Sequence, residues 1–308
     1  MPIPKLRNRL GSYVSSSISG ETVRAFIPPP LPPVPELDLG GLHQLLERAS
    51  HGLGRLNGIT KLLPDTRFLL YLYVRKEALV SSQIEGTQSS FADLLLFEND
   101  EVPRVPVEDV EEVSNYVAAM QHGLKRLREG FPLSLRLIRE IHAVLLRGGR
   151  GANKMPGEFR RTQNWIGGTR PGNASFVPPP PERLMECLDS FERFLHDEKH
   201  KLPALVEAGL MHVQFESIHP FLDGNGRLGR LLITLLLCSK GAITGPLLYP
   251  SLYLKTHRDR YYDLLQRIRT EGAWEEWLEF FLEGLGVAAE EAVDTAERTL
   301  KLFAKDKD

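Results

Sequence analysis

An eight-residue run with apolar side chains on nearly all sides, 231–238, constrains the fold of this chain more than any other segment. A helix that is apolar all round has to be enclosed by other elements, because no face of it suits water. The run ends at Gly241 and is too short to span a bilayer. It therefore predicts a central helix buried inside a layer of further helices.

Apolar residues recur with helical period through most of the remaining chain. Asp65 is the expected N-cap of the second helix, and His212 is expected to be a satisfied structural residue. There is no internal repeat and no strand-rich half, so the fold class predicted is all-α. The expected helices cover 42–53, 65–84, three segments between 91 and 149, 181–200, 203–218, 255–269 and 273–304.

Two segments interrupt the helical pattern. Residues 1–38 contain a proline cluster that excludes helix and favours polyproline II, which predicts an extended arm. A strap laid over the core or a loose tail is favoured over the alternative, a docking peptide for another domain. Residues 148–181 are rich in glycine and proline and contain short extended runs at 163–166 and 174–177. This pattern predicts a hairpin-like loop, either a flap over a site or a plain surface excursion.

Composition limits the function classes. At 308 residues and 42% hydrophobic, the chain can bury one large core or two modest ones. A net charge of −2 lacks the basic excess of a protein that binds nucleic acid through phosphates. The amino terminus has no apolar signal-like run, and Cys187 and Cys238 lie in apolar helical patterns. We expect a cytoplasmic protein in a reducing setting.

The twelve residues directly before the apolar run, 219–230, carry the chemistry. A Gly-Asn-Gly turn lets backbone N–H groups approach anionic oxygens, and the following helix adds the positive end of its dipole. Gly224, Gly226 and Gly229 also match a dinucleotide fingerprint, but no strand precedes them and no acidic residue follows near the required spacing. A P-loop is absent, and no third ligand supports zinc. The stretch predicts a polyphosphate site.

Glu85 lies at the end of the second expected helix, and Gly86 is placed to follow that end. A carboxylate there faces the negative end of the helix dipole, so it calls for a cation from elsewhere. Taken alone, this position favours a solvated surface residue over a paired one.

At this point the residues carry a family resemblance. The stretch from His219 to Arg230 fills every specified position of the Fic (filamentation induced by cyclic AMP) signature, H-x-F-x-[DE]-G-N-G-R-x-x-R. Ser81-x-x-x-Glu85-Gly86 resembles the inhibitory helix motif, [ST]-x-x-x-E-[GN], of members that carry it amino-terminal to the core. The resemblance implies an all-helical Fic core with a short β-hairpin flap that transfers AMP from ATP to a protein hydroxyl.

The resemblance also implies roles for single residues. His219, with a near-neutral pKa, is the general base, Asp223 holds Mg²⁺, and Arg230 holds the γ-phosphate. Phe221 is expected to anchor the loop in the core. Tyr261 and Tyr262 resemble a pair near the adenine, although core packing explains them nearly as well. The further residues assigned to ATP are Gly224, Asn225, Gly226, Arg227, Leu228 and Gly229, with Ile166, Gly167, Gly168 and Thr169 on the flap.

The two motifs together imply autoinhibition. We expect Glu85 to pair with Arg230 and to exclude the γ-phosphate, so that ATP binds with its α-phosphate misplaced for attack. Alternatives are removal of AMP, transfer of another phosphate-containing group by the same site, or a non-enzymatic nucleotide-binding regulator.

Four segments are expected: a proline-rich arm at 1–38, a helical region with the inhibitory helix at 39–105, a Fic core at 106–285, and a C-terminal helix at 286–308. Related chains continue there into a winged-helix domain, so nucleic acid is a partner only if such a missing domain binds it. A target protein is expected to dock at the flap, 160–177, and homodimer formation and self-modification are further options. No membrane partner is expected.

Overall fold

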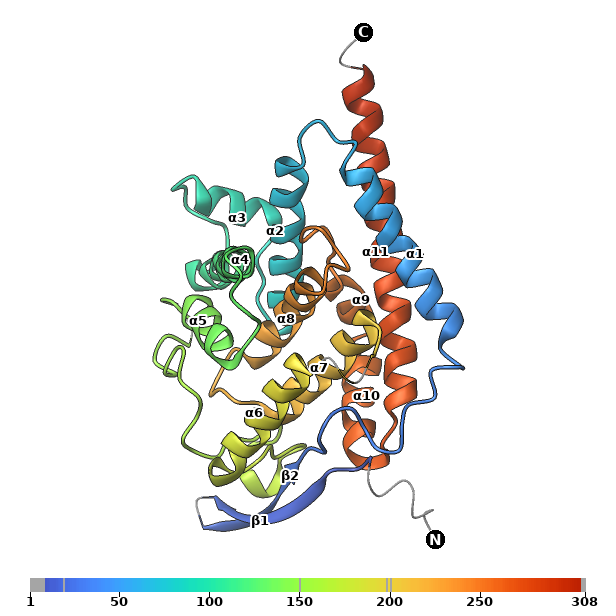
Figure 1. Cartoon of the computed structure of the whole chain (residues 1–308). Helices are drawn as coiled ribbons and strands as arrows, with labels where there is room; N and C mark the ends of the chain where they lie inside the picture. Colours follow the sequence, from blue (N-terminus) through green and yellow to red (C-terminus); the bar gives the residue numbers. More distant parts are fainter. Residues whose placement is uncertain (1–8, 19, 150, 198, 200, 306–308) are drawn as a thin grey trace.

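The computed structural model describes residues 9–18, 20–149, 151–197, 199 and 201–305. The first eight residues of the expected arm and the last three of the expected C-terminal segment lie outside the described residues. The described part is mainly helical, with one small antiparallel sheet at one end (Figure 1). The predicted all-α class with a small β element is confirmed.

The predicted central helix is α8 (Asn225–Ser239). It contacts α7 (Ala204–Ile218), α4 (Val107–Arg128), α2 (Arg67–Ile84) and α5 (Leu135–Leu145), and its residues from Leu228 to Leu235 are fully buried. Gly123 of α4 lets the two helices approach, because a Cβ there would lie 2.6 Å from Leu235 Cδ1.

The longest helix, α11 (Trp274–Lys305), lies beside α1 (His43–Thr60) along one side of the molecule and runs in the same direction (Figure 1). Ion pairs Arg48–Glu290 (2.8 Å) and Arg55–Glu297 (3.2 Å) join their exposed edges. The three helical segments expected from the sequence, 39–105, 106–285 and 286–308, share one core cluster. Leu53, Phe215 and Ala289 are members of this cluster, one from each segment. The expected boundary at 285 falls inside α11, which continues across it.

The remaining helices are shorter. They are α3 (Phe91–Glu98), α6 (Pro181–His196), α9 (Ser251–Thr256) and α10 (Arg258–Glu271). The helix expected at 255–269 is present as α10, but it begins at Arg258, because His257 separates it from α9, which contains residues 255 and 256. The N-cap of α2 is Thr66 and not Asp65, whose carboxylate instead accepts the N–H of Arg67 at 2.8 Å.

The arm is not polyproline throughout. Strands β1 (Ser12–Ile18) and β2 (Glu21–Ile27) form an antiparallel hairpin in which Tyr13 pairs with Phe26. Alternating apolar and polar residues form these strands, Gly20 turns the chain at φ +84°, and the proline cluster begins only after β2. Farther along, Pro29 O accepts a hydrogen bond from Gln214 of α7, so the arm is a strap on the core.

The predicted hairpin-like loop is confirmed between α5 and α6. Ile166 and Phe176 form an antiparallel bridge with both hydrogen bonds (2.8 and 3.1 Å), and the short helix η2 (Pro171–Asn173) turns the chain between them. The segment from 160 to 177 is called the flap from here on. Within the described residues, we find no helix with both the length and the hydropathy of a transmembrane span.

Candidate active site

His219 lies where α7 ends, and it has the left-handed conformation (φ +48°) that few non-glycine residues adopt. Arg160 of the flap holds this strained turn: its Nε donates to His219 O and its backbone N–H to Pro220 O, both at 2.9 Å. Burial lowers the pKa of His219 to about 3, helped by the nearby charges of Arg160 and Arg269. The expected near-neutral pKa is therefore wrong, and the imidazole is neutral at physiological pH.

The loop after His219 is closed by the side chain of Asn225. Its Oδ1 accepts the Phe221 N–H and its Nδ2 donates to Phe221 O, both at 2.9 Å. The Phe221 ring is fully buried and stacks on His142 with ring centroids 3.7 Å apart, which agrees with the expected anchoring role. Because the Asn225 side chain is used in the loop, its backbone N–H is the group left for a phosphate.

His142 of α5 supports this loop from below and was not singled out from the sequence. Its Nδ1 accepts the N–H of Gly157 at 2.8 Å, so Nε2 carries the proton and donates to Asp223 O at 3.0 Å. Burial lowers the pKa of His142 to about 4. The available signal was its place four residues after Ile138, on the apolar face of that helix.

The amino terminus of α8 has donor groups that could hold an anion. Gly224 precedes it with φ +76°, and within the described residues the N–H groups of Asn225, Gly226 and Arg227 donate to no hydrogen-bond acceptor. These donors and the helix dipole favour a negative group at this point. A Cβ at position 226 would lie 2.3 Å from Glu85 Oε1, so the glycine leaves room for the Glu85 carboxylate beside this helix end.

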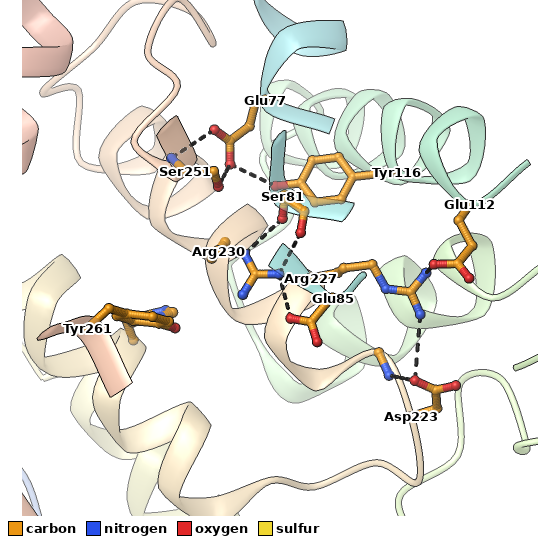
Figure 2. Close-up of polar contacts among 12 residues, drawn as sticks. Glu77, Ser81, Glu85, Glu112, Tyr116, Asp223, Arg227, Arg230, Ser251 and Tyr261 are labelled. Carbon is orange, nitrogen blue, oxygen red and sulfur yellow. Dashed lines mark hydrogen bonds and ion pairs between the residues drawn. The ribbon is translucent and has the colours of Figure 1, made fainter. Parts of the chain in front are cut away.

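Figure 2 shows how α2 and α8 meet at Arg230. The guanidinium, fully buried, donates from Nε to Ser81 Oγ (2.9 Å) and from Nη2 to Ser81 O (2.9 Å) and Glu85 Oε1 (2.7 Å). Burial alone would raise the pKa of Glu85, but the charge and hydrogen bond of Arg230 and the charge of Arg227 together lower it, and the net shift is downward. The expected pairing of Glu85 with Arg230 is present in the structure. Gly86 ends the helix at φ +104°.

One turn before Ser81, Glu77 extends this polar network. Its carboxylate accepts hydrogen bonds from Ser251 Oγ (2.5 Å) and from Tyr116 OH (3.2 Å), and it is buried (Figure 2). Burial raises the pKa of Glu77. The sequence did not indicate Glu77, because its partners come from α4 and α9, far along the chain.

Arg227 has a partner that the sequence did not reveal. Its Nη1 donates to Glu112 Oε2 at 2.7 Å, both side chains are almost fully buried, and Nη2 lies 3.6 Å from Asp223 Oδ1 (Figure 2). Glu112 lies in a charged amphipathic segment of α4, where acidic residues are ordinarily solvated. Both arginines are paired with a carboxylate, but Glu112 is almost fully buried whereas the Glu85 side chain is 34% exposed. A phosphate could therefore displace the partner of Arg230 more easily than the partner of Arg227.

The donor set fits a magnesium ion that is held mainly by its nucleotide. The Asp223 side chain is 35% exposed, and its Oδ1 accepts the N–H of Gly224 at 2.6 Å. Among the described residues no group of three His, Cys, Asp or Glu side chains could form an all-protein metal site. Mg²⁺ commonly takes one or two carboxylates and completes its shell with phosphates and water.

The remaining residues predicted to bind the nucleotide differ in burial and in contacts. Tyr261 is buried with its hydroxyl 2.9 Å from His212 Nε2, and Tyr262 is 41% exposed. Leu228 is buried and its N–H bonds to Gly224 O, while a Cβ at Gly229 would lie 2.5 Å from Glu216 Oε1. The predicted structural role of His212 is confirmed.

On the flap, Gly167 and Gly168 have φ +69° and +72°, where glycine is favoured. Thr169 N–H bonds to Asn173 Oδ1 at 3.0 Å, and Ile166 forms the bridge already described.

Comparison with known proteins gives consistent matches. The "Fic/DOC family N-terminal" model matches residues 43–125, and the "Fic/DOC family" model matches residues 132–237. A curated relative from Culex quinquefasciatus, named "Protein adenylyltransferase Fic", is 32% identical over 225 residues, which are 71% of this chain and 39% of the relative. This chain therefore spans about two fifths of the length of that relative.

Two solved structures share the fold. One is a Fic family protein from Desulfovibrio desulfuricans G20, with a TM-score of 0.70 and 23% identity, covering 85% of this chain and 76% of that chain. The other is a Fic domain containing signaling protein from Bacteroides thetaiotaomicron VPI-5482, with a TM-score of 0.64 and 20% identity over 83% of this chain and 97% of that chain.

Proposed function

Because the chain belongs to the Fic/DOC family, we propose that it is a protein adenylyltransferase, which transfers AMP from ATP to a Ser, Thr or Tyr hydroxyl of a protein. The observation that carries the proposal is the position of His219 six residues before the amino terminus of α8, where free N–H groups form the anion site. A base and a polyphosphate cradle are thus parts of one turn. The name of the curated relatives supports the same activity.

The reaction needs a base beside the α-phosphate. The hydroxyl oxygen forms a bond to the α-phosphorus, the bond from that phosphorus to the bridging oxygen breaks, and pyrophosphate leaves. His219, held neutral by burial, accepts the hydroxyl proton. The N–H groups of Asn225, Gly226 and Arg227 would stabilise phosphate charge, and Arg230 would orient the γ-phosphate.

Asp223 is the residue that would hold Mg²⁺, which neutralises charge on the phosphates when it is bound. The buried pair Glu112–Arg227 would fix Asp223 from behind, through Arg227 Nη2 at 3.6 Å. Tyr262 and the flap residues 166–169 would border the nucleotide.

We further propose that Glu85 inhibits the enzyme. Its carboxylate is bonded to Arg230 and lies beside Gly226, at the place a γ-phosphate would need. A γ-phosphate can reach Arg230 only by displacing Glu85, so ATP that binds without displacing it has a misplaced α-phosphate. Protein targets would dock along the flap, and a second copy of the chain is one such target.

Incubation with ATP labelled at the α-phosphate, beside ATP labelled at the γ-phosphate, tests the activity. We expect label from the α position in protein, and none after His219→Ala. Label that enters protein only from the γ position would refute AMP transfer in favour of phosphorylation. Release of AMP from modified protein without any incorporation would indicate the reverse reaction.

A further inference from the structure

We propose that Glu77 is a positioning residue of this site: it remains near Arg230 as a buried counter-charge when a γ-phosphate displaces Glu85, and it weakens the binding of either anion to the arginine. This inference rests on the proposed function, in which Arg230 orients the γ-phosphate of ATP. It explains how a buried arginine can exchange one anionic partner for another.

Three polar residues of α2 lie on one face of the helix. Glu77, Ser81 and Glu85 follow one another at intervals of four positions, which places their side chains in a row. This face meets Arg230 of α8, whose guanidinium bonds to Ser81 and to Glu85 (Figure 2). The other guanidinium nitrogen, Nη1, faces the amino terminus of α8, because a Cβ at Gly226 would lie 3.1 Å from it. The helix thus presents one carboxylate on each side of the serine that orients the arginine.

The two carboxylates differ in their freedom to move. Glu85 is the C-cap residue of α2, and its side chain is 34% exposed. Glu77 lies two turns earlier and is 1% exposed. It accepts hydrogen bonds from Ser251 Oγ (2.5 Å), from Ser251 N–H (3.2 Å) and from Tyr116 OH (3.2 Å). Glu85 can therefore turn toward solvent when a phosphate arrives, whereas Glu77 stays in place.

The partners of Glu77 favour its ionised form. The Ser251 N–H can only donate and both hydroxyl groups can donate, so no partner requires a proton on the carboxylate. Burial raises the pKa of Glu77, while these hydrogen bonds and the charge of Arg230 oppose the rise. Within the described residues no cation forms an ion pair with Glu77. Arg230 compensates its charge across the space that Ser81 and Tyr116 occupy (Figure 2).

A second negative charge near Arg230 changes how strongly the arginine binds any anion. A fully buried guanidinium without a counter-charge is costly, so it would retain its one anion tightly. Glu77 supplies part of the compensation permanently, and it also repels a phosphate that approaches Arg230. Arg230 can therefore release Glu85 in favour of a γ-phosphate and can later release pyrophosphate.

The test compares nucleotide binding by the full chain with and without the charge of Glu77. Glu85→Gly is the background, because in the unchanged protein Glu77→Gln would strengthen both rivals for Arg230. In this background we expect Glu77→Gln to lower the Kd for ATP with Mg²⁺ about tenfold by calorimetry, since a charge that repels the γ-phosphate is gone. ADP, which lacks the γ-phosphate, should bind both proteins equally.

Glu98→Gln in the same background is the matched control. Glu98 also contacts α2, through a 2.8 Å ion pair with Arg75, but within the described residues no hydrogen bond or ion pair joins it to Arg230. The Kd for ATP should stay unchanged in this variant. If Glu77→Gln does not fold, Ser251→Ala replaces it. Loss of the hydroxyl that donates to Glu77 at 2.5 Å favours the neutral carboxyl and should lower the Kd for ATP as well.

A higher or unchanged Kd for ATP would overturn the inference, because a residue that only supports the fold would loosen the site when it is changed. An equal gain in ADP binding would overturn it too, since the effect would then not act through the γ-phosphate. These measurements do not require AMP transfer. If Glu85→Gly incorporates no label from α-labelled ATP, the proposed function fails, while the difference between ATP and ADP still decides the role of Glu77.

Discussion

Glu85 and Arg230 are 145 positions apart in the chain and meet at 2.7 Å in the structure. The pair is bonded through one carboxylate oxygen, while Ser81 accepts hydrogen bonds from Nε and from the same Nη2 of the guanidinium. Removal of Glu85 therefore leaves Arg230 oriented by Ser81 and ready for a phosphate. Glu85 can therefore be substituted without loss of the hydrogen bonds with Ser81 that orient Arg230.

We expect Glu85→Gly to raise incorporation of α-label from ATP by about tenfold or more, because the γ-phosphate no longer competes with a carboxylate for Arg230. Incorporation is measured on the full chain by autoradiography. Gln88→Gly, just beyond the same helix end, is the control and should behave as the unchanged protein. Equal labelling by Glu85→Gly and the unchanged protein would contradict inhibition by Glu85.

The buried imidazole of His142 makes the stability of the folded chain depend on pH. Its pKa is about 4 in the folded chain and 6.5 as the ordinary value, so between these limits the unfolded chain binds the extra proton. Stability from neutral His142 is complete above pH 6.5 and is lost as pH falls toward 4. The slope amounts to about 1.4 kcal/mol per pH unit.

His142→Gln tests this dependence, since a glutamine can accept from Gly157 N–H and donate to Asp223 O without titrating. Urea unfolding at several pH values should show a stability difference between the two proteins that changes in favour of the variant from pH 6.5 to 4.5. A difference that stays constant over this range would exclude His142 as a titrating group.

At the scale of elements, the approach of α4 to α8 depends on one small residue. Gly123→Ala would place a Cβ 2.6 Å from Leu235 Cδ1, and we expect a loss of about 1–3 kcal/mol in the free energy of unfolding. Gly54 of α1 is exposed and a Cβ there meets no atom within 4 Å. Gly54→Ala should stabilise the protein by about 0.5–1 kcal/mol.

Chemical denaturation of the two alanine variants measures both changes in the free energy of unfolding. Opposite signs are expected, because alanine improves helix propensity in both cases but meets a neighbour only at position 123. Destabilisation by both substitutions would show that packing around α1 is tighter than its exposure indicates.

At the scale of the whole molecule, one core cluster runs through α2, α8 and α11. We therefore expect a single cooperative unfolding transition rather than separate ones for the segments. Thermal unfolding followed by far-UV circular dichroism should share its midpoint with tryptophan emission, which reports mainly on Trp274 and Trp277 in the core. Leu53→Ala on α1 should lower that one midpoint.

Two transitions, or a Leu53→Ala variant that shifts only one probe, would instead indicate that α1 and α11 form a separate unit. The ion pairs between these helices are exposed and contribute little, so the apolar contacts are what couple them.

The amino-acid sequence by itself determined the helical class, the central helix and the flap. It also determined the candidate phosphate-binding residues within 219–230 and their candidate inhibitor, Glu85. Each of these depends on neighbouring residues: helical period, a Gly-rich turn, or a motif within twelve positions. The hairpin β1–β2 could in part have been predicted too, but the proline cluster after it obscured its alternating pattern.

Only the tertiary structure decided which charges are compensated and which groups titrate. Arg227 meets Glu112 across 115 positions, His142 meets Asp223 across 81, and the pKa of His219 falls to about 3. Burial and ion pairing sum contacts from segments far apart in the chain, and a charged residue on a helix has the same local pattern whether it is solvated or buried. For that reason local spacing identified the site, and packing assigned its partners.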